Sequence, residues 1–209
     1  MLGLIKKDFL LIKSNLKSIT LILILYIIMS IQGSLVFTYI IPFLGVMILT
    51  STFSYDDFNH WHAFAISLPQ GRNNIVKAKY ITGIIMIIIL SIFSLAISYL
   101  LPLLSNKAIP SNILNYTFES TIAIIILISF MFPIVFKYGS TNGRIKMLTI
   151  FFVISIAIGI GYKLLKPLNV FSSLNNINDY LNIIIPIISI IFLYISYSIS
   201  CKIYQKKEF

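Results

Sequence analysis

Long runs of apolar residues, separated by short polar segments, dominate the chain. The first run covers residues 18–55 and holds no charged side chain. As a single helix it would be about 57 Å long, nearly twice the thickness of the hydrocarbon core of a membrane. The Gln-Gly-Ser sequence at 32–34 is the turn-like break nearest its middle. The pattern therefore predicts two short spans, about 18–33 and 35–54, joined by a tight hairpin.

Four further runs are each long enough for a spanning helix, which needs about 20 apolar residues. They predict spans at about 80–104, 115–136, 147–165 and 180–201. Prolines within these runs are tolerated, because neighbouring helices satisfy the carbonyl groups that a proline frees. We therefore predict an all-α polytopic membrane protein with six transmembrane helices, which form one transmembrane domain over residues 1–209.

The composition agrees with this pattern and excludes a soluble domain. Apolar residues make up 58% of the chain, charged residues only 11%, and the mean hydropathy is +0.98. A soluble domain carries about 25% charged residues, so this chain has too few to cover a surface in water. The formal net charge is +10. The basic residues lie in short segments between the apolar runs, which favours a membrane topology signal over nucleic-acid binding.

The distribution of basic residues predicts the orientation in the membrane. With the N-terminus inside, thirteen of the 16 lysine and arginine residues fall in inner segments and three in outer segments. Short loops rich in lysine and arginine stay in the cytoplasm. We therefore expect a multi-pass protein of the plasma membrane with both termini in the cytoplasm.

Residues 1–17 predict an amphipathic helix before the first span. Its apolar residues recur at alternating steps of three and four and form one stripe: Leu2, Ile5, Phe9, Ile12 and Leu16. Most of the lysines lie off this stripe, where they would face anionic headgroups while the helix rests in the inner interface. Two interpretations fit equally well: an elbow helix that leads into the first span, or a generic amphipathic leader.

The inner segment before the third span is the richest in functional side chains. It holds two of the six acidic residues, both histidines and the only tryptophan. Asp56 and Asp57 are expected at a helix N-terminus, where carboxylates suit the exposed amides and the helix dipole. Pro69 would end that helix, and Gly71 would permit a tight turn. Arg72 would then open a second helix that leads into the third span.

One face of the first of these helices carries apolar residues at steps of three and four: Phe58, Trp61, Ala65 and Leu68. An exposed aromatic face of this kind is typical of a surface that docks a partner. Aromatic residues also anchor loops at membrane interfaces. The residues alone support partner docking and interfacial anchoring about equally.

The same segment resembles the first cytoplasmic loop of the ABC-2 type permeases, most closely that of their short six-span subgroup. The shared features are an acidic pair, a tryptophan, Ser-Leu-Pro, an arginine and Lys-Tyr at the third span, which stand here as Asp56, Asp57, Trp61, Ser67, Leu68, Pro69, Arg72, Lys79 and Tyr80. The six-span plan, the N-terminal helix and the chain length are also similar, so the resemblance covers nearly the whole chain. The loop departs from the pattern in carrying His60 and His62 around the tryptophan.

The resemblance implies a transport subunit that is not itself an enzyme. Residues 55–79 would form a coupling loop whose helix sits in a groove of a separate ATPase chain, and that chain would bind ATP and Mg. Two ATPase subunits and a second permease subunit, identical or related, would complete the exporter. The expected ATPase-docking residues are Tyr55, Asp56, Asp57, Phe58, Trp61, Leu68, Pro69 and Arg72.

The cargo that the resemblance implies is an amphipathic peptide. The chain is similar to permeases that export phenol-soluble modulins in staphylococci or that confer bacteriocin resistance. The residues point the same way, because the central turns of the predicted spans carry no Asp, Glu, His, Lys or Arg. Ion- and proton-coupled carriers usually need such residues within the membrane. A path lined by aliphatic and aromatic side chains suits an amphipathic or lipid-like cargo.

Other chemistry is missing from the sequence. It contains no G-x-x-x-x-G-K-[ST] phosphate loop, so the chain does not bind ATP in that way. His60 and His62 would point apart on a helix, and we expect no metal site, no catalytic residue and no cofactor on this chain. Glu119 and Asp179 are expected at the outer N-termini of the fourth and sixth spans. Two other functions stay open: a non-transporting immunity or interaction protein of the membrane, and a passive channel or carrier.

Overall fold

The computed structural model of the chain describes residues 1–32, 39–67, 71–104, 111–165 and 178–207, and every regular element in these ranges is a helix. The elements, in chain order, are α1 (Leu2–Ser14), α2 (Leu16–Gln32), the 3₁₀ turn η1 (Ile41–Phe43), α4 (Leu44–Phe58), α5 (Trp61–Ser67), α6 (Arg72–Leu104), α7 (Ile113–Tyr138), α8 (Ser140–Leu165) and α10 (Asn178–Lys206). The predicted all-α class is thereby confirmed for the described part of the chain.

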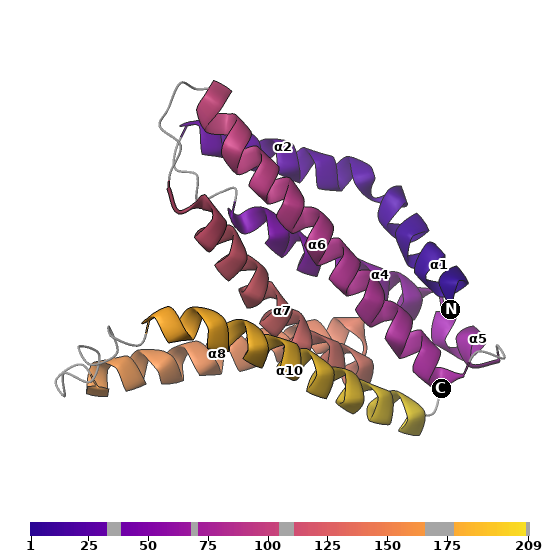
Figure 1. Ribbon diagram of the computed structural model, residues 1–209. Helices are drawn as coiled ribbons and strands as arrows, with labels where there is room; N and C mark the ends of the chain where they lie inside the picture. Colours follow the sequence, from indigo (N-terminus) through magenta and orange to yellow (C-terminus); the bar gives the residue numbers. More distant parts are fainter. Residues whose placement is uncertain (33–38, 68–70, 105–110, 166–177, 208–209) are drawn as a thin grey trace.

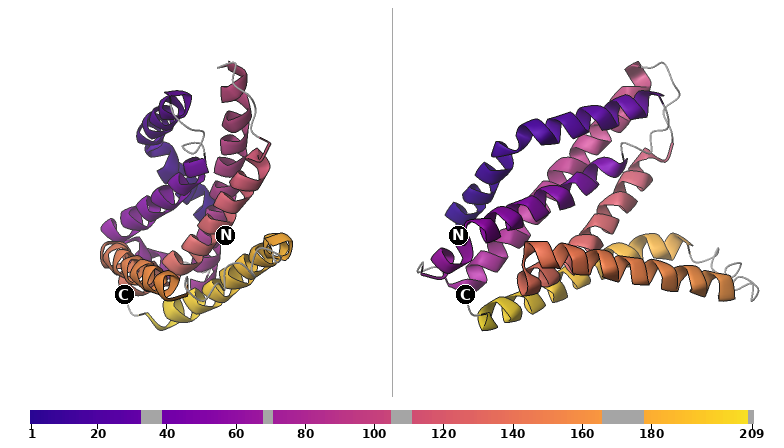
Figure 2. Two further views of the ribbon diagram at one scale, coloured as in Figure 1. Left: turned by 90° about the vertical axis from the view of Figure 1, so that its left-hand side faces the viewer. Right: turned by 180° about the vertical axis from the view of Figure 1, so that it is seen from behind.

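The helices form two arms that meet at one end of the molecule (Figure 1). The first arm holds α1, α2, α4 and α6, and the second arm holds α8 and α10, as the views in Figure 2 also show. Helix α7 joins them, because it packs against α6 of the first arm and against α8 and α10 of the second. Helix α5 and both chain termini lie where the arms meet, and we call this region the α5 end.

A hydrophobic core lies at the α5 end and is rich in aromatic rings. Phe53 of α4 meets Phe132 and Phe136 of α7 edge to face, with ring centroids 5.3 and 5.2 Å apart. Tyr80 of α6 packs on Phe132, and Tyr204 of α10 packs on Phe136. Edge-to-face pairs of this kind add to the stabilisation from burial alone. The core therefore joins both arms through α7.

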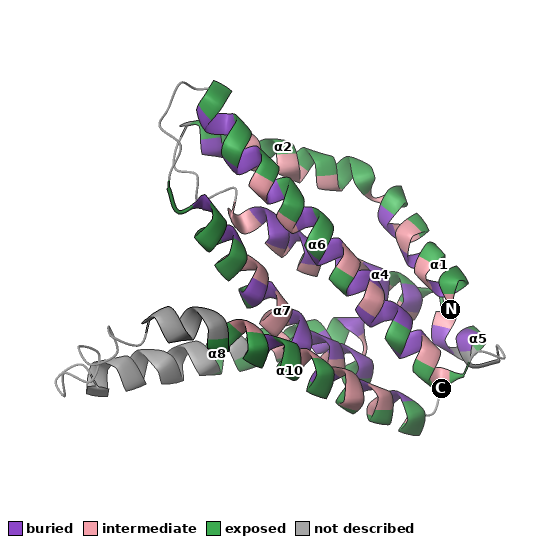
Figure 3. Cartoon of the chain, viewed as in Figure 1, coloured by how far each residue is buried: buried purple, intermediate pink, exposed green. Residues whose placement is uncertain are grey.

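A second core lies within the first arm, where Ile41, Leu44 and Ile48 pack against Met86 and Leu90 of α6. Away from the two cores, large apolar side chains stand exposed along α2, α6 and α10 (Figure 3). A helix surface that is apolar on its outer face and covered by no protein is suited to contact with lipid tails.

Among the residues that the structure describes, three helices are long and apolar enough to cross a membrane, namely α6, α7 and the Ile184–Lys206 part of α10. Helices α1 and α2 supply a fourth span if the bent pair is counted as one. The six predicted spans are therefore found only in part. Predicted span 35–54 is interrupted by η1, whose second residue is Pro42, so that α4 starts only at Leu44 and has 15 residues. The predicted hairpin at 32–34 falls largely outside the described residues.

The predicted N-terminal helix is present, but its buried face differs from the predicted stripe. Helix α1 ends at Ser14, and the chain turns by 62° before α2. The helix buries Leu4, Asp8 and Ile12, whereas Leu2 is 84% exposed. Of the expected stripe, Ile12 is buried, Ile5 and Phe9 are half-buried, and Leu2 and Leu16 are exposed, so its contact with the membrane interface stays a prediction. Helix α1 packs against α6 and α4, and Asp8 is buried there beside the Lys79 ammonium.

Candidate functional site

Three charged side chains are buried together at the α5 end. Asp8 of α1, Asp56 of α4 and Lys79 of α6 expose only 2%, 3% and 4% of their side chains. The Lys79 ammonium lies 2.9 Å from Asp8 Oδ1 and 2.7 Å from Asp56 Oδ2, and it donates to the Thr52 hydroxyl at 3.2 Å. Removing one partner of such a group leaves an uncompensated buried charge. The lysine therefore fixes α1 and α4 against α6.

Lys7 completes this group, which we call the ion cluster (Lys7, Asp8, Asp56 and Lys79). The Lys7 side chain is 23% exposed, and the Lys7 ammonium lies 2.5 Å from Asp56 Oδ1 and 3.3 Å from Asp8 Oδ1. The same ammonium lies 4.5 Å from the centre of the Trp61 ring, which is a cation–π geometry. Two carboxylates and two ammonium groups make the ion cluster neutral, and they connect α1 to the end of α4 and the start of α5.

Asp57, the neighbour of Asp56, has a different set of partners. Its Oδ2 accepts a hydrogen bond of 2.5 Å from the backbone amide of Ser140, the first residue of α8. Its Oδ1 lies 3.2 Å from Nε2 of His62, and Nδ1 of His62 lies 3.0 Å from the hydroxyl of Tyr204 in α10. Asp57 therefore reaches both helices of the second arm, one directly and one through His62.

These contacts hold Asp57 in its charged form. Burial acts to raise the pKa of Asp57, but the hydrogen bonds from His62 and Ser140 outweigh burial and lower the pKa to about 2. The N-terminus of α8 also favours a negative charge, because its first amides point outward without intrahelical acceptors. Asp57 therefore lies at the N-terminus of α8, which is not the helix that carries it.

The corner between α7 and α8 is shaped to accept Asp57. Gly139 takes a φ of +79°, and a Cβ atom at this position would lie 3.4 Å from Asp57 Oδ2. One turn further, Arg144 donates to the Thr50 carbonyl at 3.2 Å and to the Ser54 hydroxyl at 2.7 Å. The start of α8 is therefore joined to the last turns of α4 at two points.

The start of α6 is joined to the end of α10. Arg72 donates to the backbone carbonyl of Gln205 and, at 3.3 Å, to that of Lys207. The Gln205 side-chain amide donates to Asn73 at 2.8 Å. Cations at a helix C-terminus satisfy its unpaired carbonyls and suit the helix dipole. Arg72 is thus engaged within the chain.

The most exposed aromatic side chains at the α5 end are Phe58 and Phe64, within the part of the chain that the structure describes. Phe58 is the last residue of α4 and is 83% exposed, and Phe64 of α5 is 56% exposed. Between the two helices, Asn59 and His60 form a turn in which His60 takes a φ of 49°. We call residues 58–64 the α4–α5 turn.

This turn corrects the predicted helix over the segment. Asp56 and Asp57 lie in the last turn of α4 and do not begin a helix of their own, so that prediction is wrong. The break at 59–60 shifts the phase of the side chains. Ala65 is consequently 2% exposed and Trp61 is half-buried against the core, while Phe58 points outward. The predicted stripe therefore does not form one exposed face.

The remaining predicted docking residues are placed as follows. Tyr55 is 38% exposed, and its hydroxyl donates to the Asn15 side chain at 3.3 Å. Asp56 makes its contacts inside the ion cluster, so that any effect of Asp56 on docking is indirect. Leu68 and Pro69 lie outside the described residues.

Among the residues of this site that were not predicted from the sequence are Asp8, Lys79 and Phe64. Asp8 is the only acidic residue among the first 17, and it stands at helical spacing between Leu4 and Ile12. An acid on an apolar face is a signal for a buried cationic partner. For Lys79 the signal is its position at the edge of a long apolar run. Nothing in the sequence indicates that Phe64 is exposed, because its exposure depends on the turn between α4 and α5 at residues 59–60.

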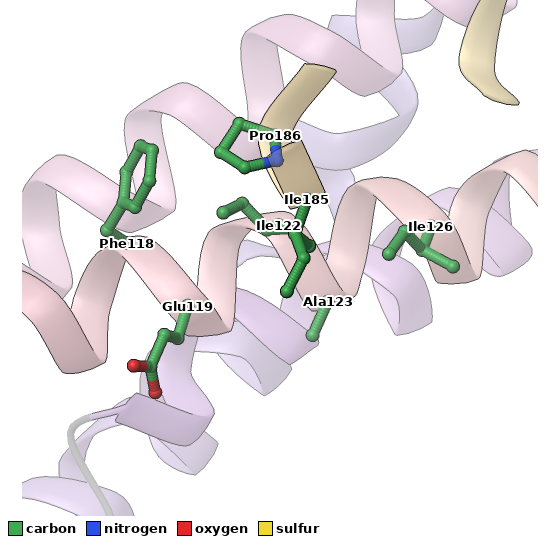
Figure 4. Close-up of a pocket in the computed structure, with 7 residues that line it drawn as sticks. All are labelled: Phe118, Glu119, Ile122, Ala123, Ile126, Ile185 and Pro186. Atoms are coloured by element: carbon green, nitrogen blue, oxygen red, sulfur yellow. The ribbon is translucent and has the colours of Figure 1, made fainter. Parts of the chain in front are cut away.

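The opposite end of α7 carries an apolar cavity of about 220 Å³ between α7 and α10 (Figure 4). Its apolar lining residues are Phe118, Ile122, Ala123, Ile126, Ile185 and Pro186. Glu119 stands at its edge, exposed, with its carboxylate directed away from Pro186. Asp179 is the second residue of α10, as expected near a helix N-terminus, and its side chain lies outside the described residues.

No three His, Cys, Asp or Glu side chains come together to hold a metal ion in the described ranges. His60 is exposed in the α4–α5 turn, whereas His62 is engaged by Asp57 and Tyr204. The chemistry of the α5 end is therefore that of ion pairs and hydrogen bonds between helices, together with an exposed aromatic turn.

Comparison with known proteins gives one match. Residues 3–205 match the sequence model of a family described as "ABC-2 family transporter protein". No curated protein and no solved structure gives a significant match to the chain.

Proposed function

Because the chain belongs to the ABC-2 family of transporter proteins, with nearly all of its length matched, we propose that it is the permease subunit of an ATP-driven exporter whose α4–α5 turn docks on the ATPase. Members of this family normally work with an ABC ATPase. In this proposal ATP and Mg are bound by that separate chain, and a second permease subunit, identical or related, completes the pathway.

The observation that carries the proposal is the exposure of Phe58 and Phe64 at the α5 end. Exposed lysines lie at the same end, among them Lys6, Lys77 and Lys206, and exposed charged groups are costly to place in the hydrocarbon core. Lipid tails therefore do not cover the turn, and two exposed phenylalanines outside the bilayer favour a protein partner. Phenylalanine is among the residues that are enriched where partner surfaces meet.

The anchoring of the turn supports a mechanical role. The ion cluster joins the end of α4 to α1 and α6, and Asp57 joins it to α8 and α10. A force applied at the turn is consequently delivered to long helices without first unfolding a loop. In the proposal, closure of the two ATPases pushes the turn and tilts these helices.

We propose the topology that the basic residues predict. The α5 end faces the cytoplasm, so that both termini are cytoplasmic, and the chain completes six spans in the plasma membrane. Helix α1 then lies at the inner interface as an elbow, with its exposed lysines toward anionic headgroups. The position of both termini beside α5 supports this arrangement.

The proposed cargo is an amphipathic peptide, such as a phenol-soluble modulin, or a related antimicrobial or lipid-like molecule. The apolar cavity between α7 and α10 and the apolar outer faces of the helices support it. A peptide with an apolar face would find aliphatic contacts along this path, whereas an ion would find no charged relay in the central turns of the spans.

Affinity purification of the chain in mild detergent from the cells that express it, with any bound ABC ATPase identified by mass spectrometry, tests the docking. We expect Phe58→Ala combined with Phe64→Ala to reduce ATPase binding at least tenfold and to leave the melting temperature unchanged, because both side chains are exposed. Phe152→Ala is the matched control, since Phe152 is 69% exposed on α8.

Export into inverted vesicles of a labelled phenol-soluble modulin tests the cargo. ATP-dependent uptake supports the exporter, uptake without ATP identifies a passive carrier, and recovery of the chain without any ATPase identifies a non-transporting membrane protein. Binding of the double variant as tight as that of the wild type would refute the docking role of the turn.

A further inference from the structure

The two consecutive acidic residues at the end of α4 are bound to opposite arms of the molecule. Asp56 contacts Lys79 of α6 and Lys7 of α1, both in the first arm. Asp57 contacts the first amide of α8 and, through His62, the end of α10, both in the second arm. Figure 1 shows the arms diverging from the α5 end, where this pair of residues stands.

Helical geometry explains the division. Successive residues on an α-helix are separated by about 100°, so Asp56 and Asp57 leave α4 in different directions. Asp56 enters the interior and is 3% exposed, whereas Asp57 reaches across to the α7–α8 corner and is 31% exposed. The last turn of α4 therefore carries two carboxylates, Asp56 and Asp57, that contact different helices.

We propose that Asp56 and Asp57 are positioning residues which transmit movement of the α4–α5 turn separately, Asp56 to the first arm and Asp57 to the second. This inference rests on the proposed docking of an ATPase at the turn. It goes further in assigning each carboxylate to one arm, and it makes export depend on both connections at once.

The two anchors differ in strength. The Asp56 connection is an ion pair with buried partners, and breaking it leaves charges uncompensated. The Asp57 connection is partly exposed to water, and it combines one amide, one imidazole and the corner at Gly139. The Asp57 connection can thus break and re-form during a transport cycle at lower cost than the Asp56 connection.

Two distances, measured by double electron–electron resonance between spin labels, follow the movement of each arm separately. A spin label at His60 in the turn is paired with a second label at Leu104 of the first arm or at Phe152 of the second arm, and Cys201 is replaced by serine. All three labelled side chains are exposed. Each distance is compared between the complex without nucleotide and the complex with Mg and a non-hydrolysable ATP analogue, using the ABC ATPase that co-purifies with the chain.

We expect nucleotide to change both distances in the unsubstituted background. Asp57→Ala should reduce the change for the second arm at least twofold and leave that for the first arm intact. The double variant Lys7→Met with Asp56→Asn should reduce the change for the first arm and leave that for the second arm intact. It keeps the ion cluster neutral, so we expect the chain to fold. Asp57→Asn, which retains an acceptor for the α8 amide, should restore part of the second-arm change.

Asn59→Ala is the matched control, because Asn59 is exposed in the same turn and its side chain donates only to the Tyr55 carbonyl of its own helix. A loss of folding alone would broaden both distances together and would not sort them by arm. If both changes shrink equally, or neither shrinks, while the ATPase still binds, the assignment of one acid to each arm is wrong and the docking stands. If the unsubstituted chain binds no ATPase, both proposals fail.

Discussion

Replacement of Lys79 by methionine is the most direct test of the ion cluster. Methionine keeps most of the length of the side chain and removes the ammonium that lies 2.9 Å from Asp8 and 2.7 Å from Asp56. The cluster would change from neutral to a net charge of −1, with Lys7 as the remaining cation for two buried carboxylates.

The magnitude follows from the burial of all three groups. Removing one partner of a buried ion pair costs about 3–5 kcal/mol, because the other charge is left uncompensated. Lys79 serves two carboxylates with at most 3% exposure, so we expect the upper part of this range. For a chain of this size 1 kcal/mol corresponds to a change in melting temperature of about 2–4 °C, which gives a decrease on the order of 10 °C.

The single cysteine provides the assay. Cys201 packs against the core at the α5 end, so a dye that fluoresces on reaction with a thiol reports when that core opens on heating in detergent. Lys77→Met is the matched control, because Lys77 is exposed on the same helix. Its effect should stay within about 2 °C, as for most surface substitutions.

A second variant separates lost charge balance from lost packing. Asp8→Asn with Lys79→Met leaves Asp56 paired with Lys7, whose ammonium lies 2.5 Å away. Neutral groups that replace a buried ion pair often cost little stability. We therefore expect the double variant to recover at least half of the decrease. A single variant that melts within about 2 °C of the wild type would refute this description of the cluster, and so would a double variant less stable than the single one.

Two further predictions concern the α7–α8 corner. Gly139→Ala should destabilise the chain by about 1–3 kcal/mol in the same melting assay, because a φ of +79° with a ψ of 174° suits glycine alone, whereas Gly3→Ala, which meets no neighbour, should be neutral. The lowered pKa of Asp57, about 2 against an ordinary value of 3.8, implies stability that is present above the unfolded pKa and is lost as the pH falls through the folded pKa. At pH 6 the wild type should be more stable than Asp57→Asn by about 1 kcal/mol, after allowance for solvent screening. Melting curves recorded from pH 6 to pH 2 should show this difference in stability disappearing between about pH 5 and pH 2.

The long helices could be predicted from the sequence because they depend on local composition. The apolar runs gave α6, α7 and α10, and Arg72 begins α6 where the second helix of the loop was predicted. The interruption at Pro42 was visible as a proline, but its effect was underestimated, since a proline within a run is often tolerated.

The functional site depended on contacts that no local pattern specifies. Lys79 lies 71 positions from Asp8 along the chain, and the two are brought together only when α1 packs on α6. The turn at Asn59 and His60 could not be predicted from the local pattern either. The apolar spacing across it permits a continuous helix, whereas in the structure α4 ends at Phe58 and His60 takes a positive φ.

Stability alone does not explain why charged residues occupy this position, because apolar side chains of similar volume would pack as well. Charged partners that pair in one geometry can give conformational specificity that apolar contacts lack. We therefore expect the ion cluster to fix the position of the α4–α5 turn as well as its packing. The Asp8→Asn and Lys79→Met double variant tests this point, because it removes two charges while keeping the cluster neutral. We expect it to melt near the wild type and still to export at least threefold more slowly. Export at the wild-type rate would show that packing, and not a fixed position of the turn, is what the charges provide.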